Sequence, residues 1–227
     1  MNSVYQILRA QLKLWLGKGV FKSYSQEGED VLMRGLLSEV GNKGIYVDVG
    51  SYHPIQYSNT YALYRRGWRG FVIDPNSNLK LLYWYFRRHD RFINVGVGEQ
   101  SEEDAEYYRF TDGAYNTFDA TEAEVTKQRQ YPVFMGKSIV PIIPLSKIVN
   151  DYQIKKIDLL TIDVEGMDLQ VLRSHDWSIL PTVVIVEDNS LRVEEFNKSE
   201  VFIFMHAKGY SLEAVVARTL IFKIHTL

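Results

Sequence analysis

Residues 45–55 read IYVDVGSYHPI, and this stretch decides the fold. Its first five residues form a mostly apolar run of strand-forming side chains, and Gly50 follows at once. A helix-like stretch, YALYRR, begins at Tyr61. A buried strand that ends in a glycine turn and leads to a helix is typical of a doubly wound α/β sheet, in which ligands bind beyond the carboxyl ends of the strands.

Strand-like and helix-like stretches alternate along most of the remaining chain. The predicted strands are continuous apolar runs, which are typical of a parallel sheet with helices on both faces. Two further strand-like stretches near the C-terminus are separated only by Arg218 and Thr219, so we expect an antiparallel hairpin at the sheet edge. Residues 98–140 fit this alternation poorly and indicate an insertion. The predicted parallel strands are IYVDV at 45–49, GFVID at 70–74, FINVGVG at 92–98, IDLLTID at 157–163 and TVVIVED at 182–188.

The composition excludes several classes of protein. The chain has 227 residues, a formal net charge of −2 and no cysteine. A nucleic-acid-binding protein is usually more basic, and without cysteine there is neither a disulfide nor thiolate chemistry. No apolar run approaches the roughly 18 residues of a membrane-spanning helix, and the N-terminus lacks the pattern of a secretion signal. We therefore expect a cytoplasmic protein with one α/β domain at residues 23–227.

The segment 1–22 predicts a separate basic helix. It contains Arg9, Lys13, Lys18 and Lys22 but no acidic residue, and its apolar residues follow helical spacing. Two interpretations stay open. In one, the helix packs over the domain with its lysines in water. In the other, it lies on a partner or makes a peripheral contact with the anionic inner face of the membrane.

The turn after the first strand is the predicted site of a ligand. Gly50 lets the backbone approach a bound molecule closely, but Ser51, Tyr52, His53 and Pro54 follow where a pyrophosphate-binding loop usually has more glycines. Proline supplies no amide, which disfavours a dinucleotide. S-adenosylmethionine has no phosphate, and one glycine can admit its amino-acid portion. The alternative is a tight turn without a ligand.

Residues at the ends of the second and third predicted strands complete the predicted site for S-adenosylmethionine. Asp74 ends the second strand in FVIDPN, 24 residues after Gly50, where a carboxylate can bind both ribose hydroxyls. A purely capping role for Asp74 is the alternative. Asn94 and Val95 follow the third strand, and we expect them near the adenine.

Four segments carry a family resemblance that covers most of the chain after residue 23. They are SQEGEDVL at 25–32, YVDVGSYHPIQYSNTYALYRRGWRGFVIDPN at 46–76, NVGVG at 94–98 and IDLLTIDVEGMDLQVL at 157–172. Together they resemble the FkbM family of S-adenosylmethionine-dependent methyltransferases. The resemblance implies a Rossmann-like, seven-stranded class I methyltransferase sheet and transfer of a methyl group to oxygen. Members of this family often act in pathways that make surface polysaccharides or glycosylated natural products.

The resemblance also implies roles for individual residues. His53 lies in the family's first-turn motif and is a candidate catalytic base, unless it only shapes the turn. In the irregular region, Tyr115, Asn116 and Thr117 are candidate contacts to the substrate. The further candidate contacts to the methyl donor are Glu27, Asp48, Ser51, Asn59 and Thr60.

Carboxylates gather at the ends of the last two predicted parallel strands. Asp163 and Glu165 follow one strand, Glu187 and Asp188 end the next, and in a parallel sheet these ends are neighbours. Like charges at close range are costly unless they are neutralised, which a divalent cation, a sulfonium or a proton could do; the alternative is that the carboxylates are purely structural. Some sugar O-methyltransferases of this fold hold magnesium with acids at these two strand ends, and by this resemblance Asp163, Glu187 and Asp188 are candidate ligands of Mg²⁺. Glu187 is also a candidate substrate contact. Glu165 is a candidate base or a partner of the donor's amino group, and Asp163 is a candidate in both donor binding and catalysis.

The predicted function is an S-adenosylmethionine-dependent O-methyltransferase that acts on a sugar hydroxyl of a glycan or activated saccharide. Methylation of a small natural product is one alternative. A methyltransferase-like domain that binds a glycan or a partner without turnover is another, from a different class. We expect no nucleic-acid partner. The sequence leaves the acceptor, the methylated hydroxyl and the oligomeric state open.

Overall fold

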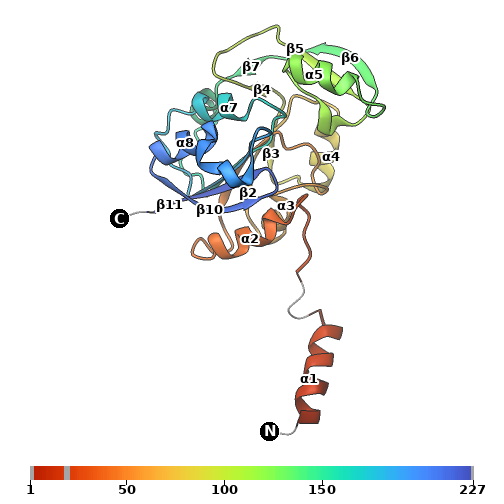
Figure 1. Cartoon of the computed structure of the whole chain (residues 1–227), viewed down its shortest axis with the longest axis vertical. Coiled ribbons are helices and arrows are strands. Elements are labelled where there is room, and N and C mark those ends of the chain that lie inside the picture. The colour runs from red at the N-terminus through yellow and green to blue at the C-terminus, as the bar shows by residue number, and fades with distance from the viewer. Residues whose placement is uncertain (1–2, 18–20, 226–227) are drawn as a thin grey trace.

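The computed structural model describes residues 3–17 and 21–225, and its centre is a seven-stranded sheet (Figure 1). The strand order is β10-β11-β9-β8-β1-β2-β3. The five strands β9, β8, β1, β2 and β3 run parallel to one another. The hairpin of β10 and β11 forms an antiparallel edge beside β9. The predicted α/β fold with a C-terminal edge hairpin is therefore confirmed. The sheet strands are β1 (Ile45–Val49), β2 (Arg69–Ile73), β3 (Arg91–Ile93), β8 (Leu159–Ile162), β9 (Val183–Glu187), β10 (Tyr210–Val216) and β11 (Thr219–Ile224).

The strand order reverses beside β1, and this reversal positions the site. From β1 the chain moves to β2 and β3 on one side, and it later returns to β8 and β9 on the other. Val49 at the end of β1 lies level with Ile73 of β2 and Ile162 of β8, so the three strands end together. Loops that leave the sheet at such a reversal diverge, and a crevice opens between them.

Helices cover both faces of the sheet. Residues of α2, α3 and α4 pack on one face, and residues of α6, α7 and α8 pack on the other. The helices of the body are α2 (Glu29–Leu36), α3 (Tyr61–Arg65), α4 (Leu79–Phe86), α6 (Leu145–Asp151), α7 (Asp168–Ser174) and α8 (Glu200–Ala207), with a 3-10 helix η2 (Val193–Lys198).

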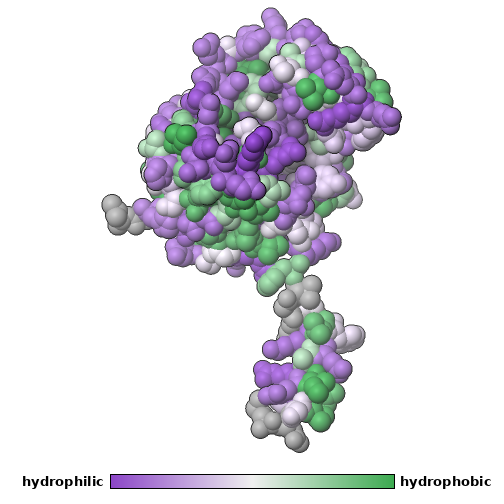
Figure 2. Space-filling view, viewed as in Figure 1, coloured by the Kyte–Doolittle hydropathy of each residue, from purple (hydrophilic) through white to green (hydrophobic). Residues whose placement is uncertain are grey.

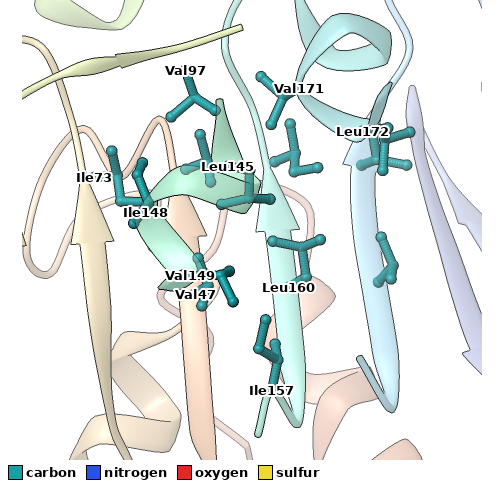
Figure 3. Close-up of a cluster of buried hydrophobic side chains, with 14 of the residues drawn as sticks. Val47, Ile73, Val97, Leu145, Ile148, Val149, Ile157, Leu160, Val171 and Leu172 are labelled. Atoms are coloured by element: carbon teal, nitrogen blue, oxygen red, sulfur yellow. The ribbon is translucent and has the colours of Figure 1, made fainter. Parts of the chain in front are cut away.

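The alternation of side chains along β1 divides the buried core in two. Val47 and Val49 belong to the cluster under α6 and α7, whereas Tyr46 belongs to the cluster on the opposite face. Figure 3 shows the first cluster, with Leu145 and Ile148 of α6 beside side chains from β1, β2 and β8. Both faces are therefore apolar, which is the reason that the strands read as continuous apolar runs.

The predicted insertion forms a small lobe beyond the carboxyl ends of the central strands (Figure 1). Two of its strands, β5 and β6, pair antiparallel, and Ala123 of α5 packs against them. The short strands β4 and β7 pair in parallel where the lobe joins the sheet domain. Its elements are β4 (Gly96–Val97), β5 (Glu106–Phe110), η1 (Gly113–Tyr115), α5 (Ala120–Lys127), β6 (Phe134–Ile139) and β7 (Ile142–Ile143).

The N-terminal helix α1 (Ser3–Trp15) points away from the rest of the protein in Figure 1. None of its residues is buried, so the interpretation in which it packs over the domain does not hold. Among the residues that the structure describes, no helix combines the length and apolar character needed to cross a bilayer.

Candidate active site

A first cavity opens beyond the carboxyl ends of β1 and β2, beneath the inserted lobe. Its empty space is about 800 Å³, part of it open to solvent, which is in the range of small-molecule sites. Its walls come from the ends of β1, β2 and β8 and from the lobe. The lining includes Gly50, Asp74, Val95, Asn116, Asp163 and Glu165.

Gly50 shapes this cavity through a backbone contact within the protein. Its backbone is left-handed, with a φ of 77°, and a Cβ atom here would overlap the backbone oxygen of Asp163. Only glycine therefore allows the turn after β1 to touch the turn after β8. Ser51 is buried, and its backbone oxygen accepts a hydrogen bond of 2.8 Å from the hydroxyl of Tyr83. Ser51 does not line the cavity, but its buried Oγ has no hydrogen-bond partner among the described residues, so its contact with the methyl donor stays a prediction.

Asp74 caps its own turn and also faces the first cavity. Its Oδ2 accepts the N–H of Tyr52 at 2.9 Å, and its Oδ1 accepts the N–H of Asn76 at 2.8 Å. Burial raises the pKa of Asp74 to about 7, and the two amides oppose this rise. Each oxygen keeps a second lone pair, so capping and binding of a ligand hydroxyl are compatible.

The residues after β3 have different roles. Val95 lines the first cavity, and its contact with the adenine of the methyl donor stays a prediction. Asn94 does not line it, and its Nδ2 donates to the backbone oxygen of Asp74 at 2.8 Å. Asn94 therefore supports the end of β2, and its contact with the methyl donor stays a prediction.

A second, larger cavity adjoins the first. Its empty space is about 1880 Å³ including solvent-open volume, and Asp163 and Glu165 line both cavities. These two carboxylates therefore lie where the cavities meet. The charged residues around the second cavity include Glu27, Glu29, Glu122, Glu187, Arg129 and Arg218.

Asp163, Glu165 and Glu187 form a carboxylate cluster whose nearest oxygens all lie within 4.8 Å of one another. Asp163 faces the open cavity, yet the protein around it withdraws it from bulk water. This desolvation, followed by the charges of Glu187 and Glu165, raises the pKa of Asp163 well above its usual range. Desolvation also raises the pKa of Glu187, although a hydrogen bond from Asp163 opposes that rise, and it raises the pKa of Glu165 to about 8. The cluster therefore retains protons at neutral pH.

The loop between β8 and α7 presents these carboxylates. Asp168 caps it by accepting the N–H groups of Val164 at 3.1 Å and Gly166 at 3.3 Å. Glu165 has a φ of 51°, a conformation that is strained for a residue with a side chain and persists where its surroundings hold it. Oγ1 of Thr117 donates to the backbone oxygen of Glu165 at 3.0 Å, which fastens the lobe to this loop.

The three predicted metal ligands are only partly brought together. Asp163 and Glu187 belong to the carboxylate cluster, but Asp188 does not. Oδ1 of Asp188 accepts the N–H and hydroxyl of Ser190, and Oδ2 accepts the hydroxyl of Ser199 at 2.6 Å. The prediction for Asp188 is corrected because consecutive residues at the end of a strand point in opposite directions. Glu165 takes its place in the cluster.

His53 lies outside the cluster and lines neither cavity. Its Nδ1 accepts the N–H groups of Ile55 at 3.1 Å and Gln56 at 3.0 Å. A ring nitrogen that accepts hydrogen bonds is unprotonated, so the proton of the neutral ring is on Nε2, and a second proton would break both contacts. Partial burial also lowers the pKa of His53. The predicted catalytic role is therefore corrected to a role in shaping the turn.

Asp48 and Thr60 point away from the cavities into a buried polar network. Its centre is Arg87, whose Nε contacts Asp90 at 2.7 Å and whose Nη2 donates to Thr60 and to the hydroxyl of Tyr46 at 2.9 Å each. Thr60 in turn donates to a carboxylate oxygen of Asp48. The predicted donor contacts at Asp48 and Thr60 are corrected to structural roles, which join α3 and α4 to β1.

The other predicted contacts line one cavity or the other. Glu27 and Asn59, predicted as donor contacts, line the second cavity and not the first. Tyr115, predicted as a substrate contact, also lines the second cavity. Asn116 and Thr117, predicted as substrate contacts, are buried and line the first.

Two arginines of the second cavity were not predicted from the sequence. Arg218 lies in the turn between β10 and β11, where its Nη1 donates to Asn189 at 2.9 Å and its charge opposes the raised pKa of Glu187. Arg129 follows α5, and its charge opposes the raised pKa of Glu165. Neither lies in a recognisable motif. The only signal for Arg218 was its place between the two predicted edge strands.

A sheet that reverses beside β1, with a small-molecule cavity at the reversal and carboxylates beyond it, defines a Rossmann-like fold with a ligand site at its switch point. A family model described as the methyltransferase FkbM domain matches residues 48–212. The chain belongs to this methyltransferase family, as its sequence motifs predicted. A search of curated proteins found no match.

Proposed function

We propose that this protein uses S-adenosylmethionine to methylate a sugar hydroxyl of a glycan or an activated saccharide. One observation carries the proposal: Asp163 and Glu165 line both the first cavity and the larger, charged cavity. A methyl donor in the first cavity and an acceptor in the second would meet beside groups that accept protons. Transfer of a methyl group to a hydroxyl requires this arrangement.

The lining of the first cavity fits the donor. Asp74 offers carboxylate oxygens to the ribose hydroxyls, and Val95 offers an apolar surface to the adenine. The cluster of Asp163, Glu165 and Glu187 suits a positively charged end of the molecule. When bound, S-adenosylmethionine supplies an electrophilic methyl group on its sulfonium sulfur.

Glu165 is the best candidate for the base. As the oxygen–carbon bond forms and the sulfur–carbon bond breaks, the acceptor hydroxyl gives up its proton. A pKa of about 8 makes the Glu165 carboxylate a stronger base than an ordinary glutamate, and the proton ends on its oxygen. The raised pKa of Asp163 favours its protonated form, which limits the negative charge beside Glu165.

The second cavity favours a polyhydroxylated acceptor. Carboxylates such as Glu122 and Glu187 accept hydrogen bonds, and Arg129 and Arg218 donate them. Each sugar hydroxyl both donates and accepts, so it can use both kinds of group. An apolar natural product would leave them without partners, which costs binding energy.

A Mg²⁺ ion is the competing account of the carboxylate cluster. Asp163, Glu165 and Glu187 offer the oxygen ligands that a hard cation prefers. Activity that EDTA abolishes and added Mg²⁺ restores would support the metal. Activity that persists in EDTA supports Glu165 as a base that acts alone.

Transfer of a labelled methyl group from S-adenosylmethionine tests the proposed function. We expect product with saccharide acceptors and none with matched deoxy sugars that lack the target hydroxyl. Product only with a small non-sugar alcohol would favour a natural-product enzyme. Donor binding without turnover on any acceptor would favour a binding domain, and a preference for NAD over S-adenosylmethionine would contradict the proposal.

Asp74→Ala tests the donor site by calorimetry with S-adenosylhomocysteine. We expect affinity to fall by roughly 1.5–3 kcal/mol, the range for hydrogen bonds to a charged group. The matched control is Asp176→Ala, because Asp176 also caps a turn, through Ser178, but is exposed and lines neither cavity. Unchanged affinity in Asp74→Ala would remove this carboxylate from the donor site.

A further inference from the structure

The helix α1 is amphipathic and has no partner among the residues that the structure describes. None of its residues is buried, and Trp15 at its end is 82% exposed. At 3.6 residues per turn, Val4, Leu8 and Leu12 fall on the same side as Trp15. Figure 2 shows hydrophobic residues along one flank of this helix and hydrophilic residues along the other.

The polar side of α1 carries only positive charge. Arg9 and Lys13 lie there beside Gln6, and the sequence places Lys18 and Lys22 just after the helix. No acidic residue occurs in this segment. Such a helix suits an anionic bilayer, with its apolar side in the acyl boundary and its basic side chains among the headgroups.

Other partners fit this surface less well. A second copy of α1 would bring basic side chains together without a carboxylate to pair with them. The body of the same chain leaves every described residue of α1 exposed. The charge therefore selects an anionic partner. The broad apolar side, which ends in a tryptophan, selects a lipid surface over a soluble polyanion.

We propose that α1 attaches the protein reversibly to an anionic lipid bilayer by lying flat in its interface. The helix has 13 residues. It is therefore about 20 Å long, too short to span the roughly 30 Å hydrocarbon core. The proposal does not depend on the reaction, because α1 contributes no residue to either cavity.

Flotation of the full-length protein with vesicles tests this attachment. We expect binding at low salt to vesicles of phosphatidylcholine and phosphatidylglycerol in equal parts. Binding to pure phosphatidylcholine vesicles should be at least tenfold weaker, and high salt should release most of the protein. Failure to bind the anionic vesicles at low salt, or equal binding to both compositions, would overturn the proposal.

Single substitutions test the contributions of the basic and the apolar side of α1 to vesicle binding separately. Arg9→Gln and Lys13→Gln should each weaken binding about fivefold. Leu8→Ser should weaken it at least tenfold, and Gln11→Leu should strengthen it severalfold by completing the apolar side. The matched control Gln6→Ala, on the polar side without a charge change, should stay within about twofold. Binding that ignores both the charge and the Leu8 variants would exclude α1 as the attachment.

Two solution measurements test the competing partners. Light scattering should give the same mass for wild-type protein and Leu8→Ser without lipid. A wild-type dimer that becomes a monomer in Leu8→Ser would assign α1 to a second copy and overturn the proposal. The melting temperature should also be the same in both proteins. A clear decrease in Leu8→Ser would show that α1 packs on the body instead.

Discussion

Glu165 and His53 differ in whether the side chain has a lone pair that is free to accept a proton. Nδ1 of His53 already accepts two backbone amides, those of Ile55 and Gln56. The carboxylate of Glu165 faces both cavities and makes no hydrogen bond to any described residue. Burial raises the pKa of Glu165 to about 8. A base needs a free lone pair before it needs a suitable pKa, so the carboxylate is the better candidate.

Glu165→Gln should therefore lower turnover by about 10²–10⁴-fold and change donor affinity only a few-fold. His53→Ala should keep most of the turnover, and its loss of the two amide contacts should appear as lower stability. In the wild-type protein, the rate should rise with pH up to about 8, because the proton-accepting form of Glu165 increases as its proton is lost. A fully active Glu165→Gln enzyme, or a stable His53→Ala enzyme that binds donor but has no turnover, would reverse this assignment.

At the scale of the elements, one buried guanidinium joins β1, α3 and α4. The side chains of Arg87 and Asp90 are both fully inaccessible to solvent. Arg87 also contacts Tyr46 of β1 and Thr60 before α3. Burial raises the pKa of Asp48 to about 6, and the charge of Arg87 opposes this rise. Removal of Arg87 would therefore leave buried acidic groups without a counter-charge.

Arg87→Leu should cost about 3–5 kcal/mol of unfolding free energy, which is the range for breaking a buried ion pair. The control Arg88→Leu changes the neighbouring, exposed arginine and should stay within about 0.5 kcal/mol. Urea unfolding measures both. If Arg87→Leu does not fold, Thr60→Val gives the milder test. It should lower stability and leave donor affinity unchanged. If Thr60→Val instead keeps its stability but binds the methyl donor more weakly, Thr60 belongs to the donor site.

At the scale of the whole molecule, the fold retains protons on several carboxylic acids. Burial raises the pKa of Asp74 and Asp168 to about 7 and that of Glu165 to about 8. In the unfolded chain these groups lose their protons near pH 4. Between the two values the folded state binds more protons, so unfolding becomes more favourable as pH rises. His53 and His175 act in the opposite sense, because burial lowers the pKa of each, but their effect ends near pH 6.5.

The melting temperature should therefore fall by a few degrees between about pH 6.5 and 8.5. Glu165→Gln should reduce this slope and raise the melting temperature at the alkaline end. The control Glu106→Gln should leave the slope unchanged, since the hydrogen bond from Lys137 lowers the pKa of Glu106 and keeps it ionised throughout this range. Scanning calorimetry across the pH series measures the effect. A melting temperature that rises with pH in the wild-type protein would contradict the raised pKa values.

Much of the fold followed from local patterns. Continuous apolar runs predicted the parallel strands, and the short break at Arg218 and Thr219 predicted the edge hairpin, which the structure confirms. The position of a residue relative to a strand end was also readable, so Gly50, Asp74, Asp163 and Glu165 could be named as candidates, and all four line the first cavity. These features depend on neighbours along the chain, which the sequence contains.

The direction of each side chain required the tertiary structure. Glu187 and Asp188 are adjacent in sequence, yet one enters the carboxylate cluster and the other binds Ser190 and Ser199. Asp48 follows the same rule on β1 and accepts a hydrogen bond from Thr60 in the buried network. The sequence by itself determined the family, the order of the elements and the edge of the sheet that holds the site. Only the tertiary structure decided which motif residues face the cavities, because that depends on strand twist, turn geometry and contacts between residues far apart in the chain.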